Sequence, residues 1–177
     1  MRYVTLLSLA LLSAAATAAQ QPASDVPDSL MPPAGTRKVL EAHATGAQIY
    51  TCAAVADGKF SWTLKGPDAD LRDADGKTIV KHSAGPTWQH MDGSRVTGKV
   101  AAKESAHQAD SVPWLLLTAD NSHSSAGALS KVTYIQRIHT DGGQPPVTGC
   151  DEAHKGDETR SNYSADYVFY AASQVQK

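Results

Sequence analysis

The sequence predicts a mainly β protein: a single-domain antiparallel sandwich or small barrel with long polar loops and one disulfide. Strand-length runs rich in β-branched and aromatic residues recur at a spacing of roughly ten residues, as in sandwiches and barrels. Asp-Gly pairs separate several of these runs, which is a strong hairpin signal. No amphipathic segment is long enough to predict a layer of helices. The sequence alone does not choose between the sandwich and the barrel.

The first half of the chain has the pattern of consecutive hairpins. Asp-Gly turns occur at residues 57–58, 75–76 and 92–93. The strand-like runs around them are residues 48–52, 60–64, 77–81, 87–89 and 95–100. Successive hairpins of this kind predict an antiparallel meander.

The second half supplies the expected central and closing strands. Residues 112–117 form the most apolar run, residues 132–138 alternate between apolar and polar, and residues 163–170 predict the last strand. The polar segments 103–111, 120–126 and 141–162 are expected to be surface loops. Short helical turns are expected only at residues 38–44 and 129–131.

The N-terminus has the pattern of a secretory signal peptide. Arg2 precedes an apolar run over residues 3–12, and small residues follow. We expect residues 1–18 to be the signal peptide, with cleavage after Ala18 or Ala19. The run is shorter than a bilayer-spanning helix, which needs about 20 apolar residues. Residues 19–34 are expected to be a linker or extended lead-in, and residues 35–177 a single β domain that is secreted or periplasmic, with no integral membrane segment.

The two cysteines and the charge balance further limit the class of protein to which this chain can belong. Cys52 and Cys150 are the only cysteines, and an even count in an exported chain predicts one disulfide. A closely spaced C-x-x-C redox pair is absent. The formal net charge of −2 is spread without long runs of one sign, which argues against nucleic acid as a partner.

Several ordered motifs carry a family resemblance. They are GPTW at 85–88, DGS at 92–94, AQIYTC at 47–52, PWLLL at 113–117, VTYIQR at 132–137, TDGG at 140–143, Cys150 and YSADY at 163–167. Over residues 30–171 the chain resembles a family of secreted bacterial and fungal proteins catalogued as a domain of unknown function. The resemblance implies no established activity, and we predict no cofactor.

Two further points limit what the resemblance implies. Some fungal relatives carry a malate dehydrogenase label, but no G-x-G-x-x-G between a strand and a helix supports it here. Gln89 stands where relatives often have a glutamate, and Ser83 where they often have an aromatic residue. An acid–base role at position 89 is therefore not expected.

The best candidate site is the stretch from residue 82 to residue 95. It places an aromatic face, two imidazoles, an amide, a carboxylate and a guanidinium close together, and its members are His82, Trp88, Gln89, His90, Asp92 and Arg95. Loops with such chemistry carry function when a scaffold positions them. The alternative is that residues 85–86 bend the chain and Trp88 fills the core.

Two finer hypotheses concern metal binding and stacking. On a strand, His90 and Asp92 would share a face and join His82 in a metal-binding set, but most histidines near turns bind nothing, and we predict no metal. Trp88 and Trp62 are either a stacking surface for a flat ligand or core residues. Trp114, inside the apolar run, is expected to be buried.

Residues 132–138 also place polar side chains beside apolar ones on the same face of the expected strand. Alternation puts Ile135 and Arg137 on one side of the strand and Tyr134 and Gln136 on the other. Arg137 and His139 are candidates to bind an anion in a cavity, or else to pair with one of the many aspartates.

Two classes of function remain. The first is an exported non-enzymatic binding or structural module whose partner is a small molecule or a protein. The second is an exported enzyme of unidentified reaction with a site around His82, Trp88, His90 and Asp92. A serine-nucleophile elbow, G-x-S-x-G, is absent, and no catalytic residue is predicted.

Overall fold

The computed structural model describes residues 25–173, and the predicted signal peptide lies outside them. Eight antiparallel strands follow one another around a closed barrel, each paired with its neighbours in the chain. They are β1 (Thr36–Ala54), β2 (Phe60–Arg72), β3 (Thr78–Ser83), β4 (Thr87–His90), β5 (Arg95–Glu104), β6 (Trp114–Asp120), β7 (Val132–Gly142) and β8 (Glu158–Ala172). Short 3-10 turns occur at Asp28–Leu30, Ala56–Gly58 and Glu152–His154.

The predicted mainly β fold is confirmed, and the barrel is the architecture found. The ring closes where β1 pairs with β8, from Thr36 opposite Ala172 to Thr51 opposite Glu158. All three Asp-Gly pairs lie in connections between consecutive antiparallel strands, as predicted. The turn between β3 and β4 instead uses Gly85 and Pro86. In the described residues, no helix is long and apolar enough to cross a membrane.

The expectation of a helical turn at residues 38–44 is wrong, because this segment belongs to β1. It pairs along β8, and its last residues also pair with β2. Charged and alanine residues there leave the local preference ambiguous, and pairing with neighbouring strands overrides it. The closing strand also begins earlier than expected, at Glu158 rather than Tyr163.

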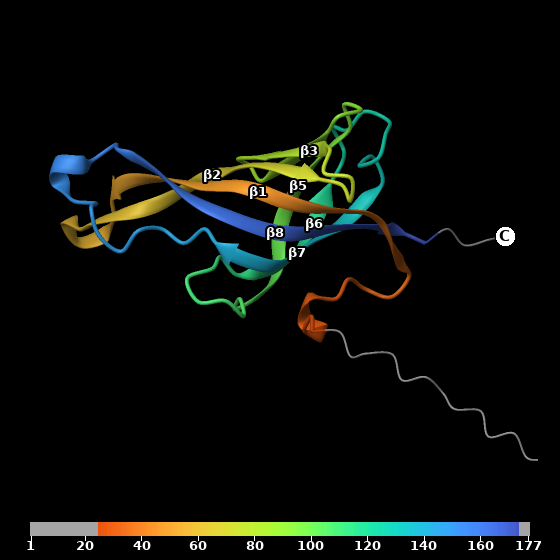
Figure 1. The fold of residues 1–177 in the computed structure, drawn as a ribbon, viewed down its shortest axis with the longest axis horizontal. Coiled ribbons are helices and arrows are strands. Elements are labelled where there is room, and N and C mark those ends of the chain that lie inside the picture. Colours follow the sequence, from red (N-terminus) through yellow and green to blue (C-terminus); the bar gives the residue numbers. More distant parts are fainter. Residues whose placement is uncertain (1–24, 174–177) are drawn as a thin grey trace, which may run out of the picture.

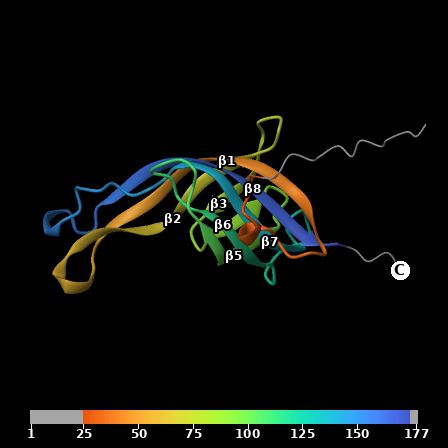
Figure 2. The same ribbon diagram turned by 90° about the horizontal axis from the view of Figure 1, so that it is seen from below.

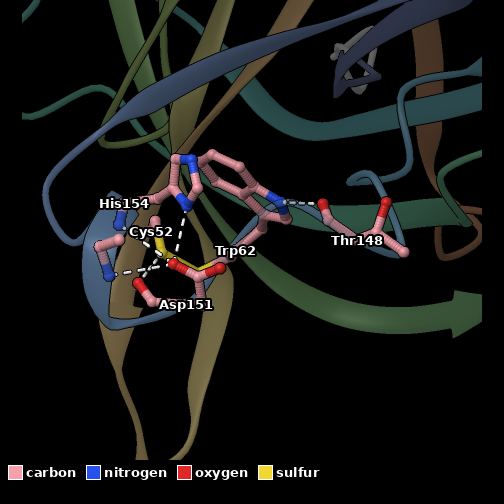
Figure 3. Close-up of a disulfide and its surroundings, with 7 residues drawn as sticks. Cys52, Trp62, Thr148, Asp151 and His154 are labelled. Atoms are coloured by element: carbon pink, nitrogen blue, oxygen red, sulfur yellow. Dashed lines mark hydrogen bonds and ion pairs between the residues drawn. A yellow bond between two sulfur atoms is a disulfide. The ribbon is translucent and has the colours of Figure 1, made fainter.

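A long twisted arm projects from the barrel, built from the ends of β1, β2 and β8 (Figures 1 and 2). The predicted disulfide is confirmed and lies in this arm, where it joins Cys52 of β1 to Cys150 in the β7–β8 connection. Figure 3 shows its surroundings: the indole Nε1–H of Trp62 donates to the Thr148 carbonyl at 2.9 Å. Asp151 accepts hydrogen bonds from the backbone N–H groups of Ala153 and His154.

The main core fills the barrel interior. Its aromatic members include Trp88, Tyr167 and Phe169, and the rings of Tyr167 and Phe169 both contact Trp88 edge to face. Gly98 on β5 provides the space for Trp88, because a Cβ there would lie 2.8 Å from the Trp88 ring. Burying such large aromatic surfaces is a dominant stabilising contribution.

A second apolar cluster lies on the other side of β6, β7 and β8. The segment before β1 supplies Leu30, which is completely buried against Trp114 and Ile138. The Gln136 amide Nε2–H donates to the Leu30 carbonyl at 2.8 Å. The segment before β1 therefore packs against the barrel from residue 26 onward.

Candidate binding site inside the barrel

A pocket of about 320 Å³ opens into the barrel. Its volume is near the lower end of the range for small-molecule sites. Aliphatic side chains, two aromatic rings and a few polar groups line it: Gln48, Leu64, Lys65, Gly66, Pro67, His82, Gly85, Pro86, Trp88, Val100, Leu115, Leu117, Arg137 and Tyr167. These residues come from β1 to β8 and from the β3–β4 turn, so only barrel closure assembles them.

A bulge and a glycine shape the rim. The β1–β2 register shifts beside Lys65, because Ile49 pairs with Gly66 and Tyr50 pairs with Leu64. Gly66 has a φ of +151°, and a Cβ there would lie 2.6 Å from the Ala84 Cβ. Only glycine fits this approach of β2 to the β3–β4 turn. Bulges bend strands and are frequent at barrel rims and next to functional sites.

His82 and Trp88 form one wall of the pocket. Their rings stack with centroids 4.2 Å apart and an angle of 9° between their planes. The His82 Nδ1–H donates to the Thr87 carbonyl at 2.9 Å, which leaves a lone pair on Nε2. Burial, reinforced by the positive charge of Arg137, lowers the pKa of His82 to about 3. The imidazole is therefore neutral at physiological pH.

Two buried N–H groups of the pocket residues have no hydrogen-bond partner within residues 25–173. They are the Gln48 amide Nε2 and the Trp88 indole Nε1. The residues are 2% and 1% exposed. A buried polar group without a partner costs about 1–3 kcal/mol, so most folds avoid it. Both nitrogens belong to side chains that line the pocket, and each is itself shielded from solvent.

Arg137 carries the positive charge of the interior. Its Nε–H and Nη2–H both donate to the Pro113 carbonyl, at 3.2 and 2.8 Å. No aspartate or glutamate in the described part of the chain forms an ion pair with it. Arg72 and Arg160, by contrast, pair with Asp70 and Asp68.

The comparisons with known proteins identify the family. A family model described as "Protein of unknown function (DUF3455)" matches residues 33–171, which include every residue that lines the pocket. The chain belongs to the DUF3455 family. Neither a curated protein nor a solved structure matches it. The predicted membership in a domain family of unknown function is confirmed.

In this DUF3455 chain, the six predicted site residues divide into two groups. His82 and Trp88 line the pocket, whereas Gln89, His90, Asp92 and Arg95 do not. Gln89 is exposed, beside Lys81 of β3 and Arg95 of β5. Arg95 holds a loop, since its Nε–H donates to the His123 carbonyl at 3.3 Å.

Asp92 joins two loops of the barrel. Its Oδ1 accepts from the Ser94 N–H and hydroxyl, at 2.8 and 2.6 Å, and its Oδ2 accepts from the Ala128 N–H at 2.8 Å. The Ser94 hydroxyl oxygen in turn accepts from the Leu129 N–H at 3.0 Å. The His90 Nδ1 accepts from the Asp92 N–H at 3.1 Å. The side chains of His90 and Asp92 therefore both form hydrogen bonds that hold the local loop geometry.

Replacing Asp92 by asparagine is expected to lower the melting temperature at neutral pH. The Ser94 hydroxyl, followed by the Ala128 and Ser94 backbone N–H groups, holds the pKa of Asp92 well below its usual range. Because folding lowers this pKa, the carboxylate stabilises the fold at neutral pH; the contribution begins to fall below the unfolded pKa of about 4 and is lost as the pH falls through the lower folded pKa. Thermal unfolding of Asp92→Asn and wild type should thus converge as the solution becomes acidic.

Asp75→Asn is the matched control for this prediction. Asp75 occupies another Asp-Gly turn and is exposed, so its replacement should leave the melting temperature unchanged. Equal destabilisation by the two substitutions would contradict the role assigned to Asp92.

The hypothesis of a His82, His90 and Asp92 metal set is not supported by the geometry. No group of three His, Cys, Asp or Glu side chains that could hold a metal ion occurs in residues 25–173. His82 faces the barrel interior, while the Asp92 oxygens accept backbone and hydroxyl groups. Trp62 and Trp88 likewise form no common stacking surface, because Trp62 lies in the arm beside the disulfide.

Sequence reasoning did not place Gln48 or Tyr167 in the site. Gln48 lies within a strand-like run and Tyr167 within the closing strand, so each resembles an ordinary strand residue. The alternation in residues 132–138 correctly put Ile135 and Arg137 on one face, and Arg137 faces the pocket. A polar residue at an inward-facing strand position is the one local signal for such a site.

Proposed function

We propose that this protein is an exported small-molecule-binding protein that holds its ligand in the barrel pocket. The observation that carries the proposal is the combination of a preformed apolar pocket with unpartnered N–H groups among the side chains that line it. Small-molecule sites typically combine hydrophobic walls with a few polar groups that orient the ligand. After a modest rotation of these side chains, a ligand could accept hydrogen bonds from the N–H groups. It would then remove the free-energy cost of leaving them unpaired.

Binding is a better account of this pocket than acid–base catalysis. No carboxylate is among the described residues that line it. His82 is neutral and, with its pKa lowered to about 3, is a weak general base at physiological pH. Acid–base catalysis typically uses two titratable groups at hydrogen-bonding distance, and the described titratable residues that line the pocket form no such pair with one another.

Export is the second part of the proposal. The basic, apolar and small-residue regions at residues 1–18 have the order of a signal peptide. The Cys52–Cys150 disulfide supports an oxidising compartment, since such bonds are rare in the cytosol. The secreted or periplasmic location therefore remains the favoured one.

Titration with small aromatic probes tests the binding function. The protein has only three tryptophans, so a ¹⁵N spectrum resolves each indole N–H, and Trp88→Phe assigns the pocket signal. We expect benzoate, benzamide, 2-naphthoate or 2-naphthamide to move the Trp88 signal saturably below about 1 mM, the range open to ligands of this size. The Trp62 and Trp114 signals serve as internal controls. The proposed site would be contradicted if all three indole signals moved together, or if no probe moved any of them.

A further inference from the structure

We propose that the ligand is a small organic carboxylate with an apolar body, and that Arg137 binds its carboxylate group. This inference rests on the proposed binding function and adds the chemical class of the ligand. Four features of the pocket carry it: the charge of Arg137, the free edge of its guanidinium, the neighbouring neutral donors and the apolar walls.

The first feature is an uncompensated positive charge. Arg137 lies half-buried at the pocket without an ion-pair partner in the described residues, and no carboxylate is among those that line the pocket. Its charge acts on other interior groups as well, because it opposes the rise that burial causes in the pKa of Tyr50 and Tyr163. Removing a charge from water without a counterion is costly, so an anion is the chemically complementary ligand.

The second feature is the guanidinium edge that remains available. The Nε–H and one Nη2–H both donate to the Pro113 carbonyl. A guanidinium has five N–H groups, so the two on Nη1 and the second on Nη2 remain. One N–H on Nη1 and the second N–H on Nη2 form the end edge of the group, which matches the two oxygens of a carboxylate. The bonds to Pro113 also hold the group in one orientation before the ligand arrives.

The third feature is a set of neutral groups among the side chains that line the same pocket. The Gln48 amide and the Trp88 indole N–H have no partner in the described residues. An amide can exchange its N–H₂ and carbonyl positions by a half-turn, so Gln48 can meet a donor or an acceptor. His82 is neutral and adds no second charge, which favours a monoanion.

The fourth feature is the aliphatic part of the wall, in which Leu115 of β6 pairs directly with Arg137 of β7. Leu64, Val100, Leu115 and Leu117 contribute aliphatic surface, and Leu64 and Val100 remain exposed at the rim. An apolar ligand body would cover this surface. Lys65 at the rim pairs with Glu158 at 2.6 Å, so its charge already has a counterion within the described residues, unlike that of Arg137.

The test compares each carboxylate probe with the neutral amide of the same shape, on the disulfide-bonded protein. We expect wild type to bind benzoate and 2-naphthoate about ten- to hundredfold more tightly than benzamide and 2-naphthamide, the range for a charge-assisted hydrogen-bonded pair. Arg137→Gln should bring this ratio close to one while amide binding persists. Arg137→Lys should keep part of the preference, and Arg72→Gln, at an exposed arginine, should keep all of it.

The outcomes separate the two proposals. Equal binding of acids and amides by wild type, or an unchanged ratio in Arg137→Gln, overturns the carboxylate assignment and leaves the binding function intact. Tighter binding of phenyl phosphate than of benzoate also overturns it. Failure of every probe to bind overturns the binding function itself. If Arg137→Gln does not fold, Gln48→Glu replaces it, since a carboxylate introduced into the pocket should repel benzoate and spare benzamide.

Discussion

Replacing Trp88 by alanine is expected to lower the free energy of unfolding by about 3–5 kcal/mol, the usual cost of deleting a buried aromatic ring. Trp88 is 1% exposed and contacts His82, Tyr167 and Phe169. Its removal would leave a cavity at the centre of the barrel, continuous with the pocket. Denaturant unfolding, monitored by far-ultraviolet circular dichroism, measures the difference.

Leu64→Ala is the control for this substitution. Leu64 is another pocket residue, but it is 54% exposed, so its loss should change the free energy of unfolding by no more than about 0.5 kcal/mol. A loss below about 1 kcal/mol for Trp88→Ala would show that the ring does not support the barrel. The pocket wall would then be a surface feature rather than part of the core.

Replacing both cysteines by serine is expected to cost about 2–5 kcal/mol, mainly because the unfolded chain gains freedom. The bridge joins residues 98 apart in sequence, so it closes a large loop in the unfolded state. In the folded state it ties the β7–β8 connection to β1, where Trp62 and Asp151 add hydrogen bonds. Chemical denaturation of the double variant and of wild type gives the change directly.

Wild type kept in a strong thiol reductant is the matched control, because it loses the bond without losing the cysteine side chains. The two samples should unfold at similar denaturant concentrations, below that of the oxidised protein. Superimposable curves for oxidised wild type and the double variant would contradict the expected contribution. The Asp75→Asn variant, with its two cysteines intact, should retain the oxidised stability.

The sequence by itself determined the local structure and the crosslink. Alternation of apolar and polar residues in 132–138 specifies both a strand and which of its residues share a face, because successive side chains point to opposite sides. The Asp-Gly pairs specify three connections, since such pairs adopt the backbone that tight turns need. With only Cys52 and Cys150 present, one intramolecular disulfide pairing is available.

Only the tertiary structure decided the closure of the barrel and the composition of the pocket. Pairing of β1 with β8 joins the two ends of the domain, and no local pattern encodes a contact between segments so distant in sequence. The same closure brings Gln48 of β1, His82 of β3 and Arg137 of β7 around one cavity. The density of polar residues in 82–95 marked His82 and Trp88, but it equally marked Asp92, whose carboxylate accepts hydrogen bonds from Ser94 in its own turn and from a neighbouring loop. Whether a polar side chain faces a cavity or completes a turn depends on strand register and closure, which are properties of the whole barrel.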